Sequence, residues 1–145
     1  GTHEYETTST PFTNSIDLGG KTTLISNLFS ANFATLNVNN RDQAASFQAA
    51  LWEIAYETSG TLATGSGVFQ LVGIGGTSLT AADTYLANAV NYTGPSLYNL
   101  TFLQSTAAQR QQNLVTATPV PVPAAGLMIV AGLGSLAMLR RRKTA

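Results

Sequence analysis

The chain has no cysteine, a single histidine and few charges, and each shortage removes a class of function. Without cysteine, its 145 residues can form no disulfide, no thiolate metal site and no cysteine nucleophile. The only histidine is His3, and the seven carboxylates are scattered along the chain. No set of residues supplies a nucleophile with a base, or a metal ion with ligands. We therefore expect no catalytic site, no metal site and no cofactor.

The charges that are present are divided unevenly along the chain. Four of the seven basic residues are Arg140, Arg141, Arg142 and Lys143, which leaves residues 1–119 with three basic and seven acidic residues, a net charge of −4. Contacts to phosphates need lysine and arginine, so we exclude nucleic acid as a partner. A composition rich in small polar residues and poor in lysine and glutamate favours an exported, β-containing protein.

The spacing of apolar and turn residues predicts one small α+β domain over residues 1–117, with a central buried helix and short strands. Because the chain begins with "GTHEYE", without an initiator methionine, we expect this domain to be incomplete at its N-terminus. The helices are predicted near residues 24–29, over 41–57, and over 80–92 with Thr80 as the N-cap. The extended segments are predicted over residues 1–12, 68–74, 96–104 and 111–118.

The segment 41–57 has the clearest helical pattern, with Asn40 or Asp42 as its N-cap. Its polar stripe is predicted to face solvent and consists of Gln43, Ser46, Ala50, Glu53 and Glu57. Gln48 falls opposite this stripe, beside Ala45, Trp52 and Ala55. A buried amide without partners costs about 1–3 kcal/mol, so we expect the Gln48 amide to bond to the backbone of an adjoining strand.

The C-terminal end has three zones with different physical roles. Residues 118–123 form a proline-rich linker in which prolines alternate with valine, a pattern that keeps the chain extended. Residues 124–139 contain no charge and predict a transmembrane helix of about 24 Å, somewhat short of a ~30 Å hydrocarbon core. Residues 140–145 carry the basic cluster Arg140–Lys143, which the positive-inside rule places in the cytoplasm, with the N-terminal domain outside.

This order of parts resembles the PEP-CTERM protein-sorting signal, and more narrowly its V-P-x-P-A variant. The matching residues are Val120, Pro121, Val122, Pro123, Ala124 and Ala125, followed by the apolar helix and the basic cluster. Val122 stands where the commonest motif has glutamate. The resemblance covers about 25 residues of the tail.

The resemblance implies a Gram-negative bacterium and export across the inner membrane. The tail would hold the protein there transiently, until an exosortase, a membrane-embedded cysteine transpeptidase, cuts it. The mature product would then reach the cell surface or extracellular matrix of a biofilm, where extracellular polysaccharide or other surface proteins are the expected partners. An alternative is a permanent single-pass membrane anchor.

The stretch "FQAALWE" within residues 47–53 more weakly resembles the Q-x-A-x-W helix of bacterial thioester domains. In those domains the glutamine side chain bonds to an upstream cysteine, and the thioester captures a nucleophile on a surface. The resemblance gives that role to Gln48, with Trp52 as its neighbour. No cysteine exists in this chain, so a covalent adhesin would need one upstream of residue 1. The two interpretations of Gln48, core amide and thioester residue, stay open here.

Overall fold

The structure is a computed structural model that describes residues 4–8, 21–58, 60–73, 75–106 and 112–121. Within these residues it has three α-helices, one 3₁₀ turn and three β-strands, so the predicted α+β class is confirmed. In chain order the elements are β1 (Tyr5–Thr8), α1 (Thr22–Asn32), the 3₁₀ turn η2 (Phe33–Thr35), α2 (Arg41–Tyr56), α3 (Gly76–Asn91), β2 (Tyr98–Ser105) and β3 (Leu114–Pro119).

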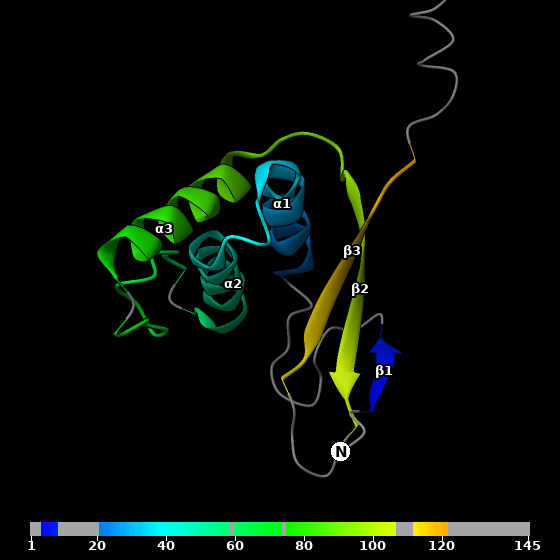
Figure 1. Cartoon of the computed structure of the whole chain (residues 1–145), viewed down its shortest axis with the longest axis horizontal. Coiled ribbons are helices and arrows are strands. Elements are labelled where there is room, and N and C mark those ends of the chain that lie inside the picture. Colours follow the sequence, from blue (N-terminus) through cyan, green and yellow to red (C-terminus); the bar gives the residue numbers. More distant parts are fainter. Residues whose placement is uncertain (1–3, 9–20, 59, 74, 107–111, 122–145) are drawn as a thin grey trace, which may run out of the picture.

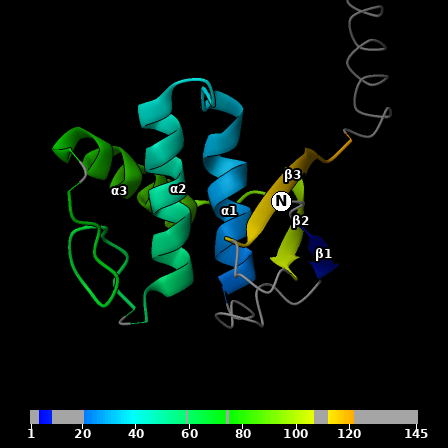
Figure 2. The ribbon, with the colours of Figure 1, turned by 60° about the horizontal axis from the view of Figure 1, so that its bottom comes forward.

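The helices and the sheet form two separate groups. Figure 1 shows α1, α2 and α3 together on one side of the molecule and the three strands on the other. Helix α3 packs against both α1 and α2, and α1 is the helix that contacts β2. In Figure 2, α1 lies between α2 and the sheet. The helical layer therefore reaches the sheet chiefly through α1.

The sheet is antiparallel, with the strand order β1-β2-β3. β2 is central, and its Phe102 pairs with Thr8 of β1 and with Val115 of β3. The predicted strands near the N-terminus and on either side of residues 106–113 are confirmed. β3 continues to Pro119, so the first two residues of the expected linker 118–123 belong to the sheet.

Aromatic side chains join the helices to the sheet. The rings of Phe29 and Phe47 meet edge to face with centroids 5.1 Å apart, and Phe33 meets Tyr98 of β2 in the same way at 5.4 Å. Such pairs contribute about 0.5–1.5 kcal/mol beyond the burial of their area. Phe102 is the only strand residue among the buried apolar side chains of the described part. The core consequently sits mainly between the helices.

A buried amide connects α1 to α3. Asn32 is almost fully enclosed, and its Nδ2 donates to the carbonyls of Leu28, at 2.9 Å, and Tyr85, at 3.2 Å. Its Oδ1 accepts from Nδ2 of Asn88 at 2.8 Å. Because each polar atom of the amide has a partner, its burial is compensated. Asn32 therefore fixes the position of α1 along α3.

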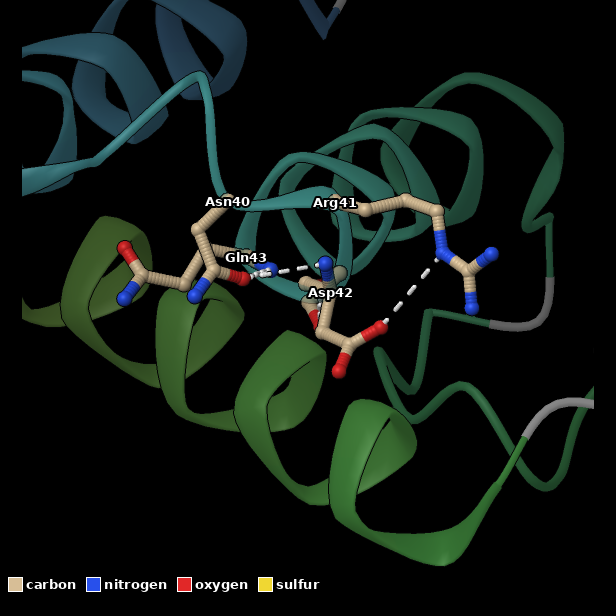
Figure 3. A network of polar contacts seen from close by, with 5 residues as sticks. Asn40, Arg41, Asp42 and Gln43 are labelled. Atoms are coloured by element: carbon tan, nitrogen blue, oxygen red, sulfur yellow. Dashed lines mark hydrogen bonds and ion pairs between the residues drawn. The ribbon is translucent and has the colours of Figure 1, made fainter.

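Helix α2 begins with a side-chain cap, which Figure 3 shows from close by. Oδ1 of Asn40 accepts from the backbone N–H groups of Asp42 and Gln43, both at 3.1 Å. The alternative N-cap, Asp42, lies inside the first turn, where its negative charge suits the helix dipole. Arg41 and Asp42 also form an ion pair at 3.9 Å, but both side chains are exposed and the pair contributes little.

Two predictions for the region between α2 and α3, a strand and a helix N-cap, are wrong. Residues 68–73 form no strand and belong to an irregular connection, the α2–α3 loop (residues 58–75); Ile74 lies outside the described residues. Helix α3 begins at Gly76 with Gly75 as N-cap, four residues before Thr80. Oγ1 of Thr80 instead donates to the carbonyl of Gly76 at 3.0 Å, a bond that a threonine inside a helix makes to its own preceding turn.

No helix among the described residues has the length and hydropathy needed to cross a bilayer. The predicted transmembrane helix 124–139 and the basic end 140–145 lie outside the described residues.

The cap of α2 gives a direct test of how the helix starts. Replacing Asn40 by Ala removes the acceptor for two backbone N–H groups, and should lower the free energy of unfolding by about 1 kcal/mol. Denaturant unfolding of the full chain in a non-ionic detergent, followed by the fluorescence of the single tryptophan, measures this change.

The matched control is Asn39→Ala, in the same exposed turn. The side chain of Asn39 makes no hydrogen bond in the described part of the chain, so this variant should change stability by less than about 0.5 kcal/mol. Equal losses in the two variants would contradict the capping role of Asn40.

Candidate functional site

Helix α2 is rotated relative to its predicted orientation. Ser46, Ala50, Glu53 and Glu57, which were expected to face solvent, are buried, and Glu53 is 0% exposed. Ala45 is exposed and Gln48 is half-buried on the other side. The expectation that Glu53 and Glu57 lie on an outer, solvated face is therefore wrong. α3 and the α2–α3 loop cover that face, and the loop supplies the partners for the carboxylates.

The carboxylate of Glu53 holds the first half of the α2–α3 loop. Its Oε1 accepts the backbone N–H of Ala63 at 2.9 Å. In the described part its second oxygen, Oε2, is buried without a hydrogen-bond partner. Leu62 and Leu71 of the loop pack against the core, and this bond adds an anchor for the loop backbone between them.

Glu57, directly after α2, holds the second half of the loop. Its Oε2 accepts the N–H groups of Val68, at 2.7 Å, and Phe69, at 3.1 Å. Gly67 precedes these donors with φ +96°, and a Cβ there would collide with Glu57 Oε2. The close approach of the carboxylate therefore requires glycine at position 67.

A third carboxylate, from α3, completes the arrangement. Oδ1 of Asp83 accepts both the N–H and the hydroxyl of Thr64, each at 2.9 Å, and Thr64 is fully buried. We call Glu53, Glu57 and Asp83 the carboxylate clamp. Glu53 lies in α2, Glu57 directly follows α2, and Asp83 lies in α3. All three accept hydrogen bonds from residues 63–69 of the loop.

One cation lies close to the clamp. Lys21, just before α1, donates from Nζ to the backbone carbonyls of Ala55, at 3.4 Å, and Glu57. These are carbonyls at the C-terminal end of α2, where a positive charge is favourable. Lys21 therefore ties the start of α1 to the end of α2 and adds a positive charge to an acidic region.

Burial raises the pKa of Glu53 above the ordinary carboxyl value of 4.5. The largest cause is the loss of solvent around its charged form. The hydrogen bond from Ala63 acts against this increase, the negative charges of Glu57 and Asp83 add to it, and the charge of Lys21 lowers the pKa. The surroundings of Glu53 therefore favour the uptake of a proton by this carboxylate.

The clamp suits anchoring better than catalysis or metal binding. In the described ranges no group of three or more His, Cys, Asp or Glu side chains is placed to hold a metal ion. Each carboxylate accepts a hydrogen bond from loop backbone, and the Thr64 hydroxyl that donates to Asp83 is itself fully buried. This geometry can hold the glycine-, threonine- and serine-rich α2–α3 loop in one conformation.

A second feature, the apolar groove, lies on the opposite side of α2. It encloses about 340 Å³ between the α1–α2 region and the first half of β3, and Gln48 lines it together with Phe33, Phe47 and Leu51. No hydrogen bond of the Gln48 amide is found in the described part of the chain, so the expected bond to a strand backbone is not found there. Trp52, one turn further along α2, is half-buried.

The described part contains only the first two residues of the predicted sorting motif. Val120 is exposed, and its N–H donates to the carbonyl of Leu97 at 2.9 Å; Pro121 is also exposed. Val122, Pro123, Ala124 and Ala125, and the cluster Arg140–Lys143, lie outside the described residues.

Sequence reasoning missed the clamp, although one signal pointed toward it. The α2–α3 loop is long and rich in glycine, threonine and serine, and its backbone donors must be paired if the loop packs on the helices. Two glutamates four residues apart, directly before such a loop, are natural acceptors. Their position was visible, but the side of α2 that the loop covers was not.

Glu53 predicts how stability depends on pH. A folded-state pKa above the unfolded value means that the folded protein binds more protons between the two values, so stability falls as the pH rises through this window. Glu53→Gln keeps a carbonyl for the Ala63 N–H but cannot ionise. As the pH rises from the ordinary carboxyl range through the folded-state pKa of Glu53, the variant should gain stability relative to the parent chain. Unfolding curves followed by Trp52 fluorescence test this.

The matched control is Glu6→Gln, the same change at an exposed position in β1. It should leave the pH dependence of unfolding unchanged. If the free energy of unfolding of Glu53→Gln and of the parent chain changed with pH in the same way, the pKa of Glu53 would be equal in the folded and unfolded states, which would contradict the prediction.

Comparisons of the chain with protein-family models, with curated proteins and with solved structures find no match. The clamp and the groove are therefore interpreted from this chain's own residues.

Proposed function

We propose that this chain is an exported bacterial surface or extracellular-matrix protein whose tail is a PEP-CTERM-type sorting signal processed by an exosortase. The observation that carries the proposal is the order of parts in the tail: the V-P-x-P-A stretch 120–124, an uncharged segment to residue 139, and the cluster Arg140–Lys143. Each part has a physical role in retention, orientation or processing at a membrane.

The described end of the chain supports this proposal. β3 ends at Pro119, and Pro119, Val120 and Pro121 are exposed. A processing enzyme needs an extended segment that it can reach, and proline keeps such a segment out of a helix or a central strand. The domain thus delivers the chain to the start of the motif in an accessible form.

We further propose that the mature domain has a structural, non-catalytic role. Its carboxylates Glu53, Glu57 and Asp83 accept hydrogen bonds from the backbone of the α2–α3 loop, which supports an anchoring role for them. The domain is held in the inner membrane only until the tail is cut, with residues 1–117 outside, and then acts at the surface or in the matrix.

A substitution in the motif tests the processing step. Pro123→Leu, made in the full-length gene product in its native cells, should leave uncleaved precursor in the inner membrane, because the enzyme no longer reads the motif. Pro119→Leu is the matched control: Pro119 ends β3 outside the motif, so this variant should be released normally. Unchanged release of Pro123→Leu into the medium would contradict the sorting proposal.

The intact mass of the protein in each cell fraction tests the outcome of sorting. A released form ending near residues 122–125 is expected in the medium or matrix fraction. If the only form were membrane-bound and retained Lys143, the tail would be a plain anchor and the exosortase would have no role.

A further inference from the structure

The apolar groove has an open strand edge as one of its walls. β3 is the last strand of the sheet, and in the described part no backbone hydrogen bond joins its outer side to another residue. The groove is lined on this side by residues 113–117, and the opposite wall is formed by side chains that include Phe33, Phe47 and Leu51. An unpaired strand edge thus lies beside an apolar hollow.

This edge has few of the features that usually protect an edge strand. The six residues of β3 include no charged side chain, and its only proline is the last residue, Pro119. Lysine, an inward-pointing charge, a bulge or a covering segment commonly prevents pairing at such edges. The edge of β3 is therefore chemically able to accept another strand.

The absence of charged side chains from the groove restricts its occupant. All thirteen residues that line it are uncharged, and Gln48, Asn113 and Thr116 are its only polar ones. An ionised group placed there would lose its water without gaining a counter-ion. The complementary occupant is uncharged and mainly apolar where it enters the groove.

A small apolar molecule would fill the hollow but leave the edge of β3 unsatisfied. Covering backbone N–H and C=O groups without pairing them costs free energy. An extended peptide pairs these groups and sends alternate side chains toward the groove, since side chains alternate between the two faces of a strand. The volume of about 340 Å³ suits side chains of this kind.

We propose that β3 and the apolar groove bind an extended, uncharged polypeptide segment with apolar residues at alternate positions, which adds a fourth strand to the sheet beside β3. The groove receives the apolar side chains, and Gln48, whose amide has no partner in the described part, borders the added strand. This surface shares no residue with the carboxylate clamp or with the proposed sorting motif 120–125.

The probe is the peptide acetyl-Val-Thr-Val-Thr-Val-amide with a fluorescent label. It is titrated against the full chain in phospholipid nanodiscs, with empty nanodiscs as background, and binding is followed by anisotropy. Hydrogen exchange should show new protection in residues 114–119. Two N-methylated versions of the peptide are compared, one methylated at the odd and one at the even backbone nitrogens. Only one of these two sets of N–H groups faces β3, so one version should lose binding and the other should keep it.

A pair of protein variants locates the site. Val38 lines the groove and Val90 lies on α3 outside it, and both side chains are 58% exposed, so neither supports the core. Val38→Glu should weaken binding of the probe at least about ten-fold, since it places a charge at the groove. Val90→Glu should leave the affinity unchanged.

Three results would overturn the proposal. One is the absence of saturable binding at millimolar probe. Another is binding that both N-methylated versions retain, which would make the groove a site for apolar molecules. The last is a chain that is dimeric without probe, with residues 114–119 already protected and the dimer dissociated by Val38→Glu; the occupant would then be a second copy of the chain.

Discussion

The burial of Glu53 constrains the rest of the helical layer. A fully enclosed carboxylate is tolerated only where its surroundings offset the loss of water, and here the backbone N–H of Ala63 provides part of that compensation. The loop that carries Ala63 must therefore lie against α2, and Glu57 and Asp83 hold its next residues in the same way. Because Asp83 belongs to α3, the clamp also sets how α2 and α3 meet. The loop is positioned by these three acceptors together with Leu62 and Leu71, which pack against the core.

The sequence predicted the elements better than their orientation. The Asn40 cap, the long helix behind it and the strands on either side of residues 106–113 depend on local chemistry, and the structure has all of them. The orientation of α2 was different, because apolar or small residues surround most of this helix and periodicity gives no decisive face. Reading Glu53 and Glu57 as solvated was reasonable for isolated charges. It failed because the partners are backbone groups of the α2–α3 loop, and backbone partners leave no pattern in side-chain spacing.

The side-chain amides of Gln48 and Asn32 also show that the sequence does not predict which polar groups are buried. Gln48 was expected to be a buried amide that needed partners, yet it is half-buried at the groove, and no partner for it is found among the described residues. The buried and fully bonded amide is Asn32, whose partners lie on its own helix and on α3. Nothing in the sequence around Asn32 distinguishes it from the many other asparagines of this chain. Its role depends on the distance between α1 and α3, a tertiary quantity, and so becomes visible only in three dimensions.

The two sides of α2 carry out different tasks, and this division bears on what the domain can do after export. On one side the clamp fixes the loop with charged acceptors, of which Glu53 and Glu57 are buried and Asp83 is exposed. On the other side the groove presents uncharged side chains, and the outer edge of β3 makes no backbone hydrogen bond to another described residue. β3 is also the strand that leads into the exposed prolines at the start of the tail. A segment added beside β3 would thus lie next to the base of the tail, so access to the proposed processing motif and occupation of the groove are governed by the same strand.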